Sequence, residues 1–327
     1  MDINKTLRAF MDSVGLGPIE FNPPDFSGLS SKQIATQLRS SFYKASRAVE
    51  PDVPQLAEIS AHIVDGQDGP LPARAYTPLG AGVGAGPGII YFHGGGFVLG
   101  DLDSHDMIAR RLAHSSRCRV LSVDYRLAPE HKFPAAHGDA EAAWRWAVER
   151  ADLIGMDPDR IAVAGDSAGG NLAAFICQEM NRTGGPMPAF QLLLYPLVQF
   201  VDIRAKKMSF QESGFFISPN LFDYFRDAYI EKEVERTDPR VSPLFAEEDD
   251  FAGLPPAHFV LCGWDPLKDE GQTYADKLSA HGVPVTLREH KNMVHGFMNL
   301  TGVSKPAREA IHDAGHIVGK ALGALDG

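Results

Sequence analysis

The chain has 327 residues, of which 44% are hydrophobic and 22% charged, a balance typical of folded globular proteins and not of disordered ones. Its formal net charge of −11 argues against a nucleic-acid partner, because binding to phosphates needs a basic surface. The N-terminus has no apolar core of signal-peptide length, and the longest apolar run, AFQLLLYPLVQFV, is too short and interrupted to span a bilayer. Three widely spaced cysteines, Cys118, Cys177 and Cys262, indicate buried free thiols in a reducing compartment. We therefore expect a cytoplasmic protein with no membrane span.

Strand and helix patterns alternate along most of the chain. LAEISAHIV and LPARAYTP flank the turn DGQDGP and predict an antiparallel pair of strands. Further apolar strands are predicted at 88–92, 119–125, 160–166, 190–196, 257–263 and 284–290, with helices that include 104–116, 135–151 and 269–282. Near-continuous apolar strands that alternate with helices predict an α/β protein, with a mostly parallel sheet covered on both faces.

Two regions lie outside this alternation. Residues 1 to about 50 have helical patterns but no strand signal, and residues from about 200 to 244 are rich in aromatic side chains. These aromatic residues are Phe200, Phe210, Phe215, Phe216, Phe222, Tyr224, Phe225 and Tyr229. Extra helices on the surface would account for them. We also expect this insertion to roof a pocket at the carboxyl ends of the strands, where open α/β sheets bind ligands.

The segment VAGDSAGGN contains Gly165-Asp166-Ser167-Ala168-Gly169, which matches the pattern G-x-S-x-G. The pattern alone is weak evidence, but RIAVAGD before it reads as a strand and AGGNLAAFICQEM reads as a helix. Ser167 would therefore lie in the sharp turn between them, where the two glycines relieve strain and allow close approach of the backbone. The turn would project the hydroxyl at a helix N-terminus, which favours negative charge. Ser167 is the candidate nucleophile.

A serine hydroxyl needs a base to take its proton, and the chain has twelve histidines. His295 lies in NMVHGF, just beyond the last predicted strand, on the side of the sheet where Ser167 is expected. His290 closes that strand itself and is the nearest rival. His258 lies at the start of the preceding strand, at the opposite edge. We therefore favour His295 as the base.

The base needs an acidic partner that fixes its tautomer and stabilises the imidazolium. Asp265 directly follows the predicted strand HFVLCG and precedes His295 in the sequence. Asp269 and Glu270 open the following helix, where acidic residues usually serve as caps or interact with the helix dipole. We therefore favour Asp265. The resulting order Ser167, Asp265, His295 is that of the α/β-hydrolase fold.

The segment YFHGGGFVLG, residues 91–100, ends a strand with a histidine and three glycines. Attack on an ester carbonyl places negative charge on its oxygen, and backbone N–H groups can stabilise that charge where no side chain blocks the approach. We expect Gly94 and Gly95 to donate from one side of the oxyanion and Ala168 from the other. His93 is expected to hold the loop in shape and to take no part in proton transfer.

On these residues the chain resembles the hormone-sensitive lipase family of esterases, also called bacterial family IV, within the α/β hydrolases. Five segments carry the resemblance: YFHGGGFVLGD (91–101), DYRLAPEHKFPAA (124–136), GDSAGGN (165–171), DPLKDEG (265–271) and HGF (295–297). The resemblance implies an α/β-hydrolase core of residues 51–199 and 245–327, with a helical cap built from residues 1–50 and the insertion 200–244. It implies the triad and the oxyanion donors named above.

The resemblance also implies a small-molecule ester as substrate, a preference for short acyl chains, no cofactor or metal, and a homodimer. In DYRLAPE, Arg126 and Glu130 resemble buried ion-pair or backbone-anchoring residues.

The leading hypothesis is a carboxylesterase for short- to medium-chain acyl esters, which forms an acyl-enzyme on Ser167 that water activated by His295 resolves. One alternative is a non-catalytic small-molecule receptor, because the plant gibberellin receptors resemble this family but have lost the catalytic histidine. This chain keeps His295 with its Gly-Phe context. A second alternative keeps the triad and changes the substrate to amides or to acetyl groups on sugars or drugs.

Overall fold

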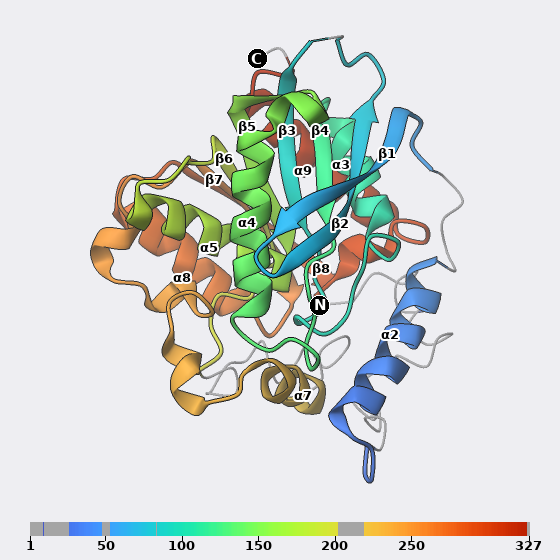
Figure 1. Cartoon of the computed structure of the whole chain (residues 1–327), viewed down its shortest axis with the longest axis vertical. Coiled ribbons are helices and arrows are strands. Elements are labelled where there is room, and N and C mark those ends of the chain that lie inside the picture. The colour runs from blue at the N-terminus through green and yellow to red at the C-terminus, as the bar shows by residue number, and fades with distance from the viewer. Residues whose placement is uncertain (1–8, 10–25, 48–52, 83, 202–218, 326–327) are drawn as a thin grey trace.

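The described part of the chain is built around an eight-stranded sheet with the strand order β1-β2-β4-β3-β5-β6-β7-β8 (Figure 1). This computed structural model describes residues 9, 26–47, 53–82, 84–201 and 219–325. The strands are β1 (Leu56–Gly66), β2 (Gly69–Pro78), β3 (Gly86–Phe92), β4 (Arg119–Val123), β5 (Met156–Asp166), β6 (Phe190–Leu194), β7 (Ala257–Trp264) and β8 (Val285–Val294). β2 is antiparallel to both of its neighbours, and β3 to β8 are parallel to one another. The predicted hairpin and parallel sheet are confirmed.

Helices cover both faces of this sheet. The α-helices of the described residues are α2 (Ser31–Arg47), α3 (Asp106–Ser116), α4 (Ala135–Glu149), α5 (Ala168–Thr183), α7 (Pro219–Tyr229), α8 (Lys268–Ala280) and α9 (Lys305–Ala321). Short 3-10 turns lie at Ala151–Ile154, Glu233–Thr237, Pro243–Phe245, Glu248–Phe251 and Phe297–Leu300. Within the described ranges, none of these helices has the length and apolar character that crossing a membrane requires.

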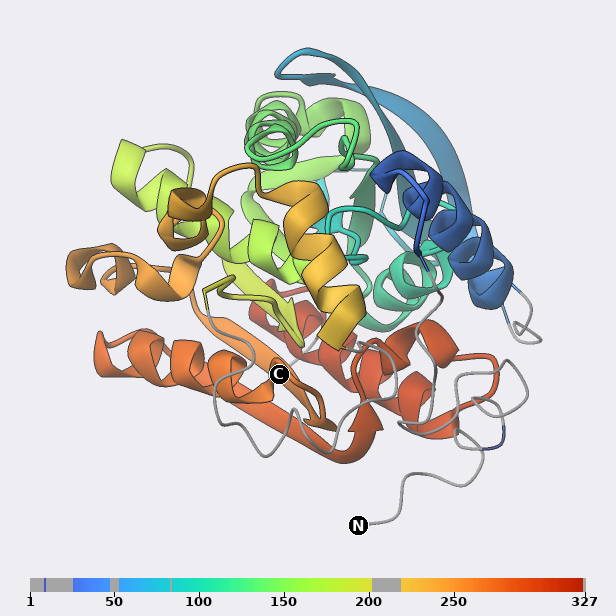
Figure 2. The same ribbon diagram turned by 90° about the horizontal axis from the view of Figure 1, so that it is seen from below.

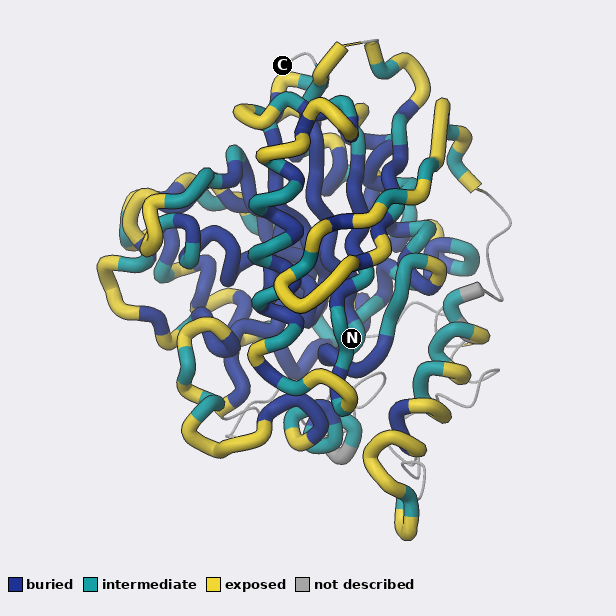
Figure 3. The backbone as a smooth tube through the Cα atoms, in the orientation of Figure 1, coloured by how far each residue is buried: buried dark blue, intermediate teal, exposed yellow. Residues whose placement is uncertain are grey.

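Two buried cores lie on the two faces of the sheet. α4, α5 and α8 share one core with Ile90 and Phe92 of β3, and α3 and α9 share the other with Ile89 and Tyr91. Successive side chains of a strand point to opposite faces, so a strand between two cores must be apolar at every position. Figure 3 shows the result, with buried strands at the centre and an exposed turn between β1 and β2.

The largest differences from the prediction concern β5, β8 and α9. β5 begins at Met156, four residues early, because an irregular pair joins it to Gly86 ahead of the regular ladder. β8 continues to Val294, so that His295 directly follows the strand. The sequence analysis did not assign α9, although Ser304 caps its N-terminus by accepting the amide hydrogen of Ala307 (3.3 Å), which is a common start signal for helices.

α2 and α7 lie outside the α/β alternation, at the end of the sheet where the parallel strands finish (Figures 1 and 2). The Tyr224 hydroxyl on α7 donates a hydrogen bond to the Ser31 carbonyl at the start of α2 (2.8 Å). Arg39 on α2 donates to the carbonyls of Val98 and Ala128 (both 2.8 Å), which anchors α2 to the core. Residues 1–8, 10–25, 48–50 and 202–218 of the predicted cap, which include Phe210, Phe215 and Phe216, lie outside the described residues.

Arg126 and Glu130 of the DYRLAPE segment both form ion pairs, as their resemblance implies. Arg126 binds the completely buried carboxylate of Asp139 (2.7 Å) and also binds Asp68 (2.8 Å). Glu130 binds Arg39 of α2 (2.8 Å). The side chains of Arg126 and Glu130 are 21% and 34% exposed, so the expectation that they are buried is wrong. Solvent reaches both residues because Asp68, the second partner of Arg126, lies on the exposed hairpin turn and Arg39, the partner of Glu130, lies on α2.

Replacing Arg126 by alanine should lower the free energy of unfolding by roughly 3–5 kcal/mol, because a buried carboxylate without its cation is strongly destabilising. Urea unfolding of the purified variant measures this loss. Lys305→Ala is the control, since Lys305 and Glu309 form a pair in which the side chains are 77% and 60% exposed, and it should cost less than about 1 kcal/mol. Equal losses in the two variants would contradict the assigned role of Arg126.

Burial lowers the pKa of three histidines, His93, His137 and His258, to about 4. A histidine in the unfolded chain has a pKa of about 6.5. Between these values the unfolded chain binds protons that the native protein does not bind. The free energy of unfolding therefore falls as the pH is lowered through this window. Above the window these histidines do not make it depend on pH.

His258→Gln should make the unfolding free energy less dependent on pH between about 6.5 and 4.5, by about 1.4 kcal/mol per pH unit. His258 lies in β7, where its Nδ1 is bonded to Thr286 Oγ1 of β8 (2.7 Å), away from Ser167. Urea unfolding at a series of pH values gives the slope. The exposed His312 provides the control, because His312→Gln should leave the slope unchanged. An unchanged slope in His258→Gln would show that the buried ring is not the source.

Candidate active site

Ser167 occupies the tight turn between β5 and α5. Its φ of +54° and ψ of −114° lie in a region that side chains other than glycine rarely adopt, and such strain persists only where the surroundings hold it. The end of β6 does so here. The Ser167 amide donates to the Leu194 carbonyl (2.9 Å), and the Ser167 carbonyl accepts from the Leu197 amide (3.0 Å). The turn therefore holds Ser167 at the N-terminus of α5, as predicted.

The glycines around Ser167 allow three backbone segments to meet. A Cβ on Gly165 would overlap the Gly169 carbonyl, and a Cβ on Gly169 would overlap the carbonyl of Phe92 at the end of β3. Gly170 is also tight, since its Cβ would lie 2.9 Å from a Pro196 side-chain carbon. The predicted need for close approach at positions 165 and 169 is confirmed.

The structure brings Ser167, His295 and Asp265 into one hydrogen-bonded chain. His295 Nε2 lies 2.8 Å from Ser167 Oγ, and His295 Nδ1 lies 2.8 Å from Asp265 Oδ2. All three side chains are buried. The Leu267 amide donates to the other Asp265 oxygen (2.8 Å), and the Tyr195 ring packs edge-on against the imidazole. A carboxylate oxygen accepts hydrogen bonds, so Nδ1 carries the proton and Nε2 presents its lone pair to the Ser167 hydroxyl.

The rival residues have other contacts. His290 lies inside β8, paired with β7, and burial lowers its pKa. His258 is bonded to β8, as described above. Among the acids, Asp269 lies in the first turn of α8, and Glu270 accepts a hydrogen bond from Gln199 Nε2 (2.9 Å). The geometry therefore favours the same acid and base as the sequence.

At each of the three glycines of the HGGG segment, a different steric constraint excludes a side chain. A Cβ on Gly94 would overlap the Asp166 carboxylate. Gly95 has a φ of +116° and Gly96 a φ of +63°, which side chains disfavour. A Cβ on Gly96 would also lie 2.5 Å from the ring of Phe225 on α7. α7 thus packs directly on the loop that follows β3.

The backbone amides of this loop differ in their partners. The Gly94 N–H donates to Asp166 Oδ1 (2.8 Å), and one N–H cannot serve this carboxylate and an oxyanion equally. Among the described residues, the amides of Gly95, Gly96 and Ala168 make no hydrogen bond. The sequence analysis placed Gly94 among the oxyanion donors, and the structure uses this amide in another bond. The sequence analysis did not consider the amide of Gly96, although the third glycine of the string was the available signal.

His93 shapes the loop, as expected. Its Nδ1 lies 2.8 Å from the Gly94 carbonyl, its ring stacks on Tyr125 with a centroid distance of 4.3 Å, and the Tyr125 hydroxyl donates to the His93 carbonyl (2.6 Å). A carbonyl oxygen can only accept, so Nδ1 is the donor. Burial lowers the pKa of His93 to about 4, which keeps the ring neutral near pH 7.

A second buried histidine, His137, links α5 to α7. Asn171 on α5 donates through Nδ2 to the carbonyls of Leu197 and Val241 (both 2.8 Å), so its Oδ1 accepts from His137 Nε2 (3.0 Å). The other ring nitrogen of neutral His137 then accepts from the Tyr229 hydroxyl on α7 (2.7 Å). The sequence analysis did not identify this network, because its hydrogen bonds join residues 26 to 92 positions apart.

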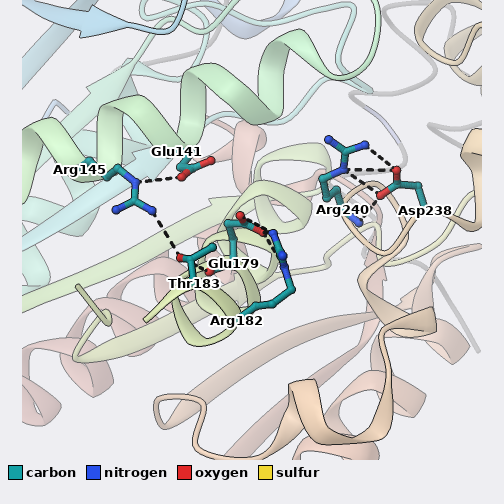
Figure 4. Close-up of polar contacts among 7 residues, drawn as sticks. All are labelled: Glu141, Arg145, Glu179, Arg182, Thr183, Asp238 and Arg240. Atoms are coloured by element: carbon teal, nitrogen blue, oxygen red, sulfur yellow. Dashed lines mark hydrogen bonds and ion pairs between the residues drawn. The ribbon is translucent and has the colours of Figure 1, made fainter. Parts of the chain in front are cut away.

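A separate hollow of about 360 Å³ lies between α4 and α5. Its arginines are paired with carboxylates in Figure 4: Arg145 with Glu141 (2.9 Å), Arg182 with Glu179 (2.7 Å) and Arg240 with Asp238 (2.7 Å). The hollow therefore presents balanced charge. In the described ranges, no group of three or more His, Cys, Asp or Glu side chains could hold a metal ion.

Comparisons with known proteins agree with this architecture. Residues 89–299 match the family model of the alpha/beta hydrolase fold. The carboxylic ester hydrolase LipN of Mycobacterium tuberculosis is 46% identical over 243 residues, which cover 72% of this chain and 63% of LipN, less than two thirds of its length. The ethyl acetate hydrolase of Pseudomonas putida is 34% identical over 316 residues, which cover 95% of this chain and 96% of that protein.

Among solved structures, the ester-hydrolase EH1AB1 from the metagenome of Lake Arreo, in complex with a derivative of bipyridine phosphonate, has a TM-score of 0.89. It is 39% identical, and the match covers 99% of this chain and 100% of that chain. As its resemblance to the hormone-sensitive lipase family implies, this chain belongs to the α/β-hydrolase fold family.

Proposed function

We propose that this protein is a carboxylesterase that uses Ser167 as nucleophile, His295 as base and Asp265 as the acid that orients the base. The observation that carries the proposal is the chain of two 2.8 Å hydrogen bonds from Ser167 Oγ through the imidazole to Asp265. This arrangement activates a hydroxyl that is otherwise a poor nucleophile. Esterase and ester hydrolase activities are named for LipN, the ethyl acetate hydrolase and EH1AB1.

In the first half of the reaction, Ser167 Oγ attacks the ester carbonyl carbon while its proton moves to His295 Nε2. The carbonyl oxygen becomes an oxyanion, which we assign to the amides of Gly95, Gly96 and Ala168. We exclude Gly94 because its N–H is bound to a carboxylate. The tetrahedral intermediate collapses when the C–O bond to the alcohol breaks, and the alcohol leaves with the proton from Nε2. The acyl group remains on Ser167.

Water completes the turnover. His295 Nε2 takes a proton from the water as its oxygen attacks the acyl carbon, and a second oxyanion forms in the same place. Collapse of this intermediate returns the proton to Ser167 Oγ and releases the carboxylic acid. Asp265 stays ionised and stabilises the imidazolium in both halves, so proton and charge balance within the three side chains.

We propose short- to medium-chain acyl esters as substrates and α2 and α7 as parts of the cap over them. The contact of Phe225 with Gly96 supports this placement, because a cap helix that close to the oxyanion donors limits the space for the acyl group. The three cysteines are buried and unpaired, which fits a reducing, cytoplasmic compartment. The homodimer and the cytoplasmic location stay predictions.

A receptor function finds less support. The gibberellin receptors resemble the family without its histidine, whereas His295 here lies within hydrogen-bond distance of Ser167 Oγ. The amidase or deacetylase alternative uses the same triad, and only a comparison of substrates can distinguish it from the esterase.

Ser167→Ala should lower kcat on a short-chain p-nitrophenyl ester by about 10³-fold or more, because it removes the atom that forms the acyl-enzyme. A fluorophosphonate probe should label the wild type at Ser167 and leave the variant unlabelled. Ser60→Ala, on the edge strand β1, is the matched control and should keep full activity and labelling. If Ser167→Ala retained more than a few per cent of wild-type turnover, the nucleophile would be assigned wrongly.

A series of p-nitrophenyl esters of increasing acyl length should give the highest kcat/KM at about four to eight carbons, in line with the family resemblance, since a longer chain must displace the cap. Matched amides should react far more slowly than the esters. An optimum on long-chain emulsions would refute the proposed chain length, and faster hydrolysis of the amides would favour the amidase.

A further inference from the structure

A buried carboxylate joins the nucleophile turn to the loop after β3. Asp166, the last residue of β5, is 2% exposed, and its Oδ1 accepts two hydrogen bonds. One comes from the Gly94 amide (2.8 Å) and the other from the Tyr91 hydroxyl (2.5 Å). Charge-assisted hydrogen bonds of this kind are the strong ones in proteins. One side chain adjacent to Ser167 thus holds the strand end and the first loop glycine together.

The other carboxylate oxygen is compensated from a different element. His105 Nε2, also buried, lies 3.7 Å from Asp166 Oδ2, and His105 Nδ1 lies 3.1 Å from Ser104 Oγ. Burial by itself would raise the pKa of Asp166, but the interactions with His105 and Tyr91 outweigh it, and the pKa lies below its ordinary value. Asp166 is therefore a carboxylate near pH 7, which is the form that accepts hydrogen bonds most strongly.

The same contact explains why position 94 is glycine. A Cβ there would overlap Asp166 Oδ2 and lie 2.8 Å from the Asp166 backbone carbonyl. The carboxylate and the loop backbone therefore meet without a side chain between them. Because Gly95 and Gly96 directly follow the tethered amide, their orientation relative to Ser167 depends on where Asp166 holds Gly94.

We propose that Asp166 is a positioning residue, whose bond to the Gly94 amide sets the oxyanion donors Gly95 and Gly96 relative to the Ser167 hydroxyl. The inference rests on the proposed esterase function. Asp166 contacts none of the reacting atoms, so its removal acts on the transition state through the loop. Displacing a catalytic group by about 1 Å, or losing one oxyanion donor, costs on the order of 10²-fold in rate.

Asp166→Ala tests the tether in the full-length protein with a short-chain p-nitrophenyl ester. Active sites are counted by end-point fluorophosphonate titration, so that misfolded protein does not lower the measured kcat. We expect kcat per titrated site to fall about 10²-fold with KM within threefold of wild type. A trifluoromethyl ketone becomes an oxyanion when Ser167 adds to it. Its inhibition constant should rise by the same factor as kcat falls. Asp166→Asn, which keeps an acceptor for the Gly94 amide, should restore kcat to within about tenfold of wild type.

Two further variants separate positioning from stability. Tyr91→Phe removes the other donor to the same oxygen and leaves the tether in place, so kcat should stay within about threefold of wild type. Gly94→Ala breaks the tether from the loop side and should reproduce the kinetic pattern of Asp166→Ala. If Asp166→Ala yields no folded protein, Gly94→Ala decides by the same criteria.

The proposal is overturned if the tether variants keep kcat within threefold, if the inhibitor constant does not follow the loss in kcat, or if Tyr91→Phe loses as much activity as they do. A wild type that hydrolyses none of the esters refutes the proposed function, and this inference with it. An active wild type with unaffected tether variants refutes this inference alone.

Discussion

The architecture of the site depends on one close approach, that of the end of β3 to the start of α5. Gly169 lies so near the Phe92 carbonyl that no Cβ fits between them. Two backbones at this distance fix the loop after β3 beside the turn that carries Ser167, because neither segment can shift without a collision. The parallel sheet positions the other two side chains, since β7 and β8 end at the same edge and place Asp265 and His295 beside the turn.

Around this contact, residues of one short motif serve different physical tasks. Gly94 accommodates a carboxylate, Gly95 adopts a left-handed conformation, and Gly96 makes room for Phe225. Hydrogen bonds to Gly94 then hold the loop in the position that this packing gives it. A neutral His93 donates to the Gly94 carbonyl, and Asp166 accepts from the Gly94 amide, so both backbone groups of this residue are held. In the proposed mechanism the oxyanion donors are thereby arranged before a substrate arrives, which is what makes an oxyanion site effective.

The sequence predicted the sheet, the tight turn at Ser167 and the positions of Asp265 and His295 beyond β7 and β8, because each of these has a local sequence pattern. Apolar strands between two helical layers and glycines around a serine are such patterns. Contacts between distant segments leave none. The bond between Gly94 and Asp166 joins residues 72 positions apart, so Gly94 was assigned to the oxyanion. Arg126 and Glu130 were expected to be buried because their partners on the hairpin turn and on α2 could not be identified from spacing.

Because Phe225 packs on Gly96, the same contact would affect both the binding of a substrate and the rate of the reaction. In the proposed mechanism, an acyl group too large for the site would displace α7. Because α7 packs on Gly96, this would also displace one of the amides assigned to the oxyanion. Such a substrate would bind more weakly and would also react more slowly. For the proposed esterase, discrimination against oversized esters would therefore act on kcat as well as on KM.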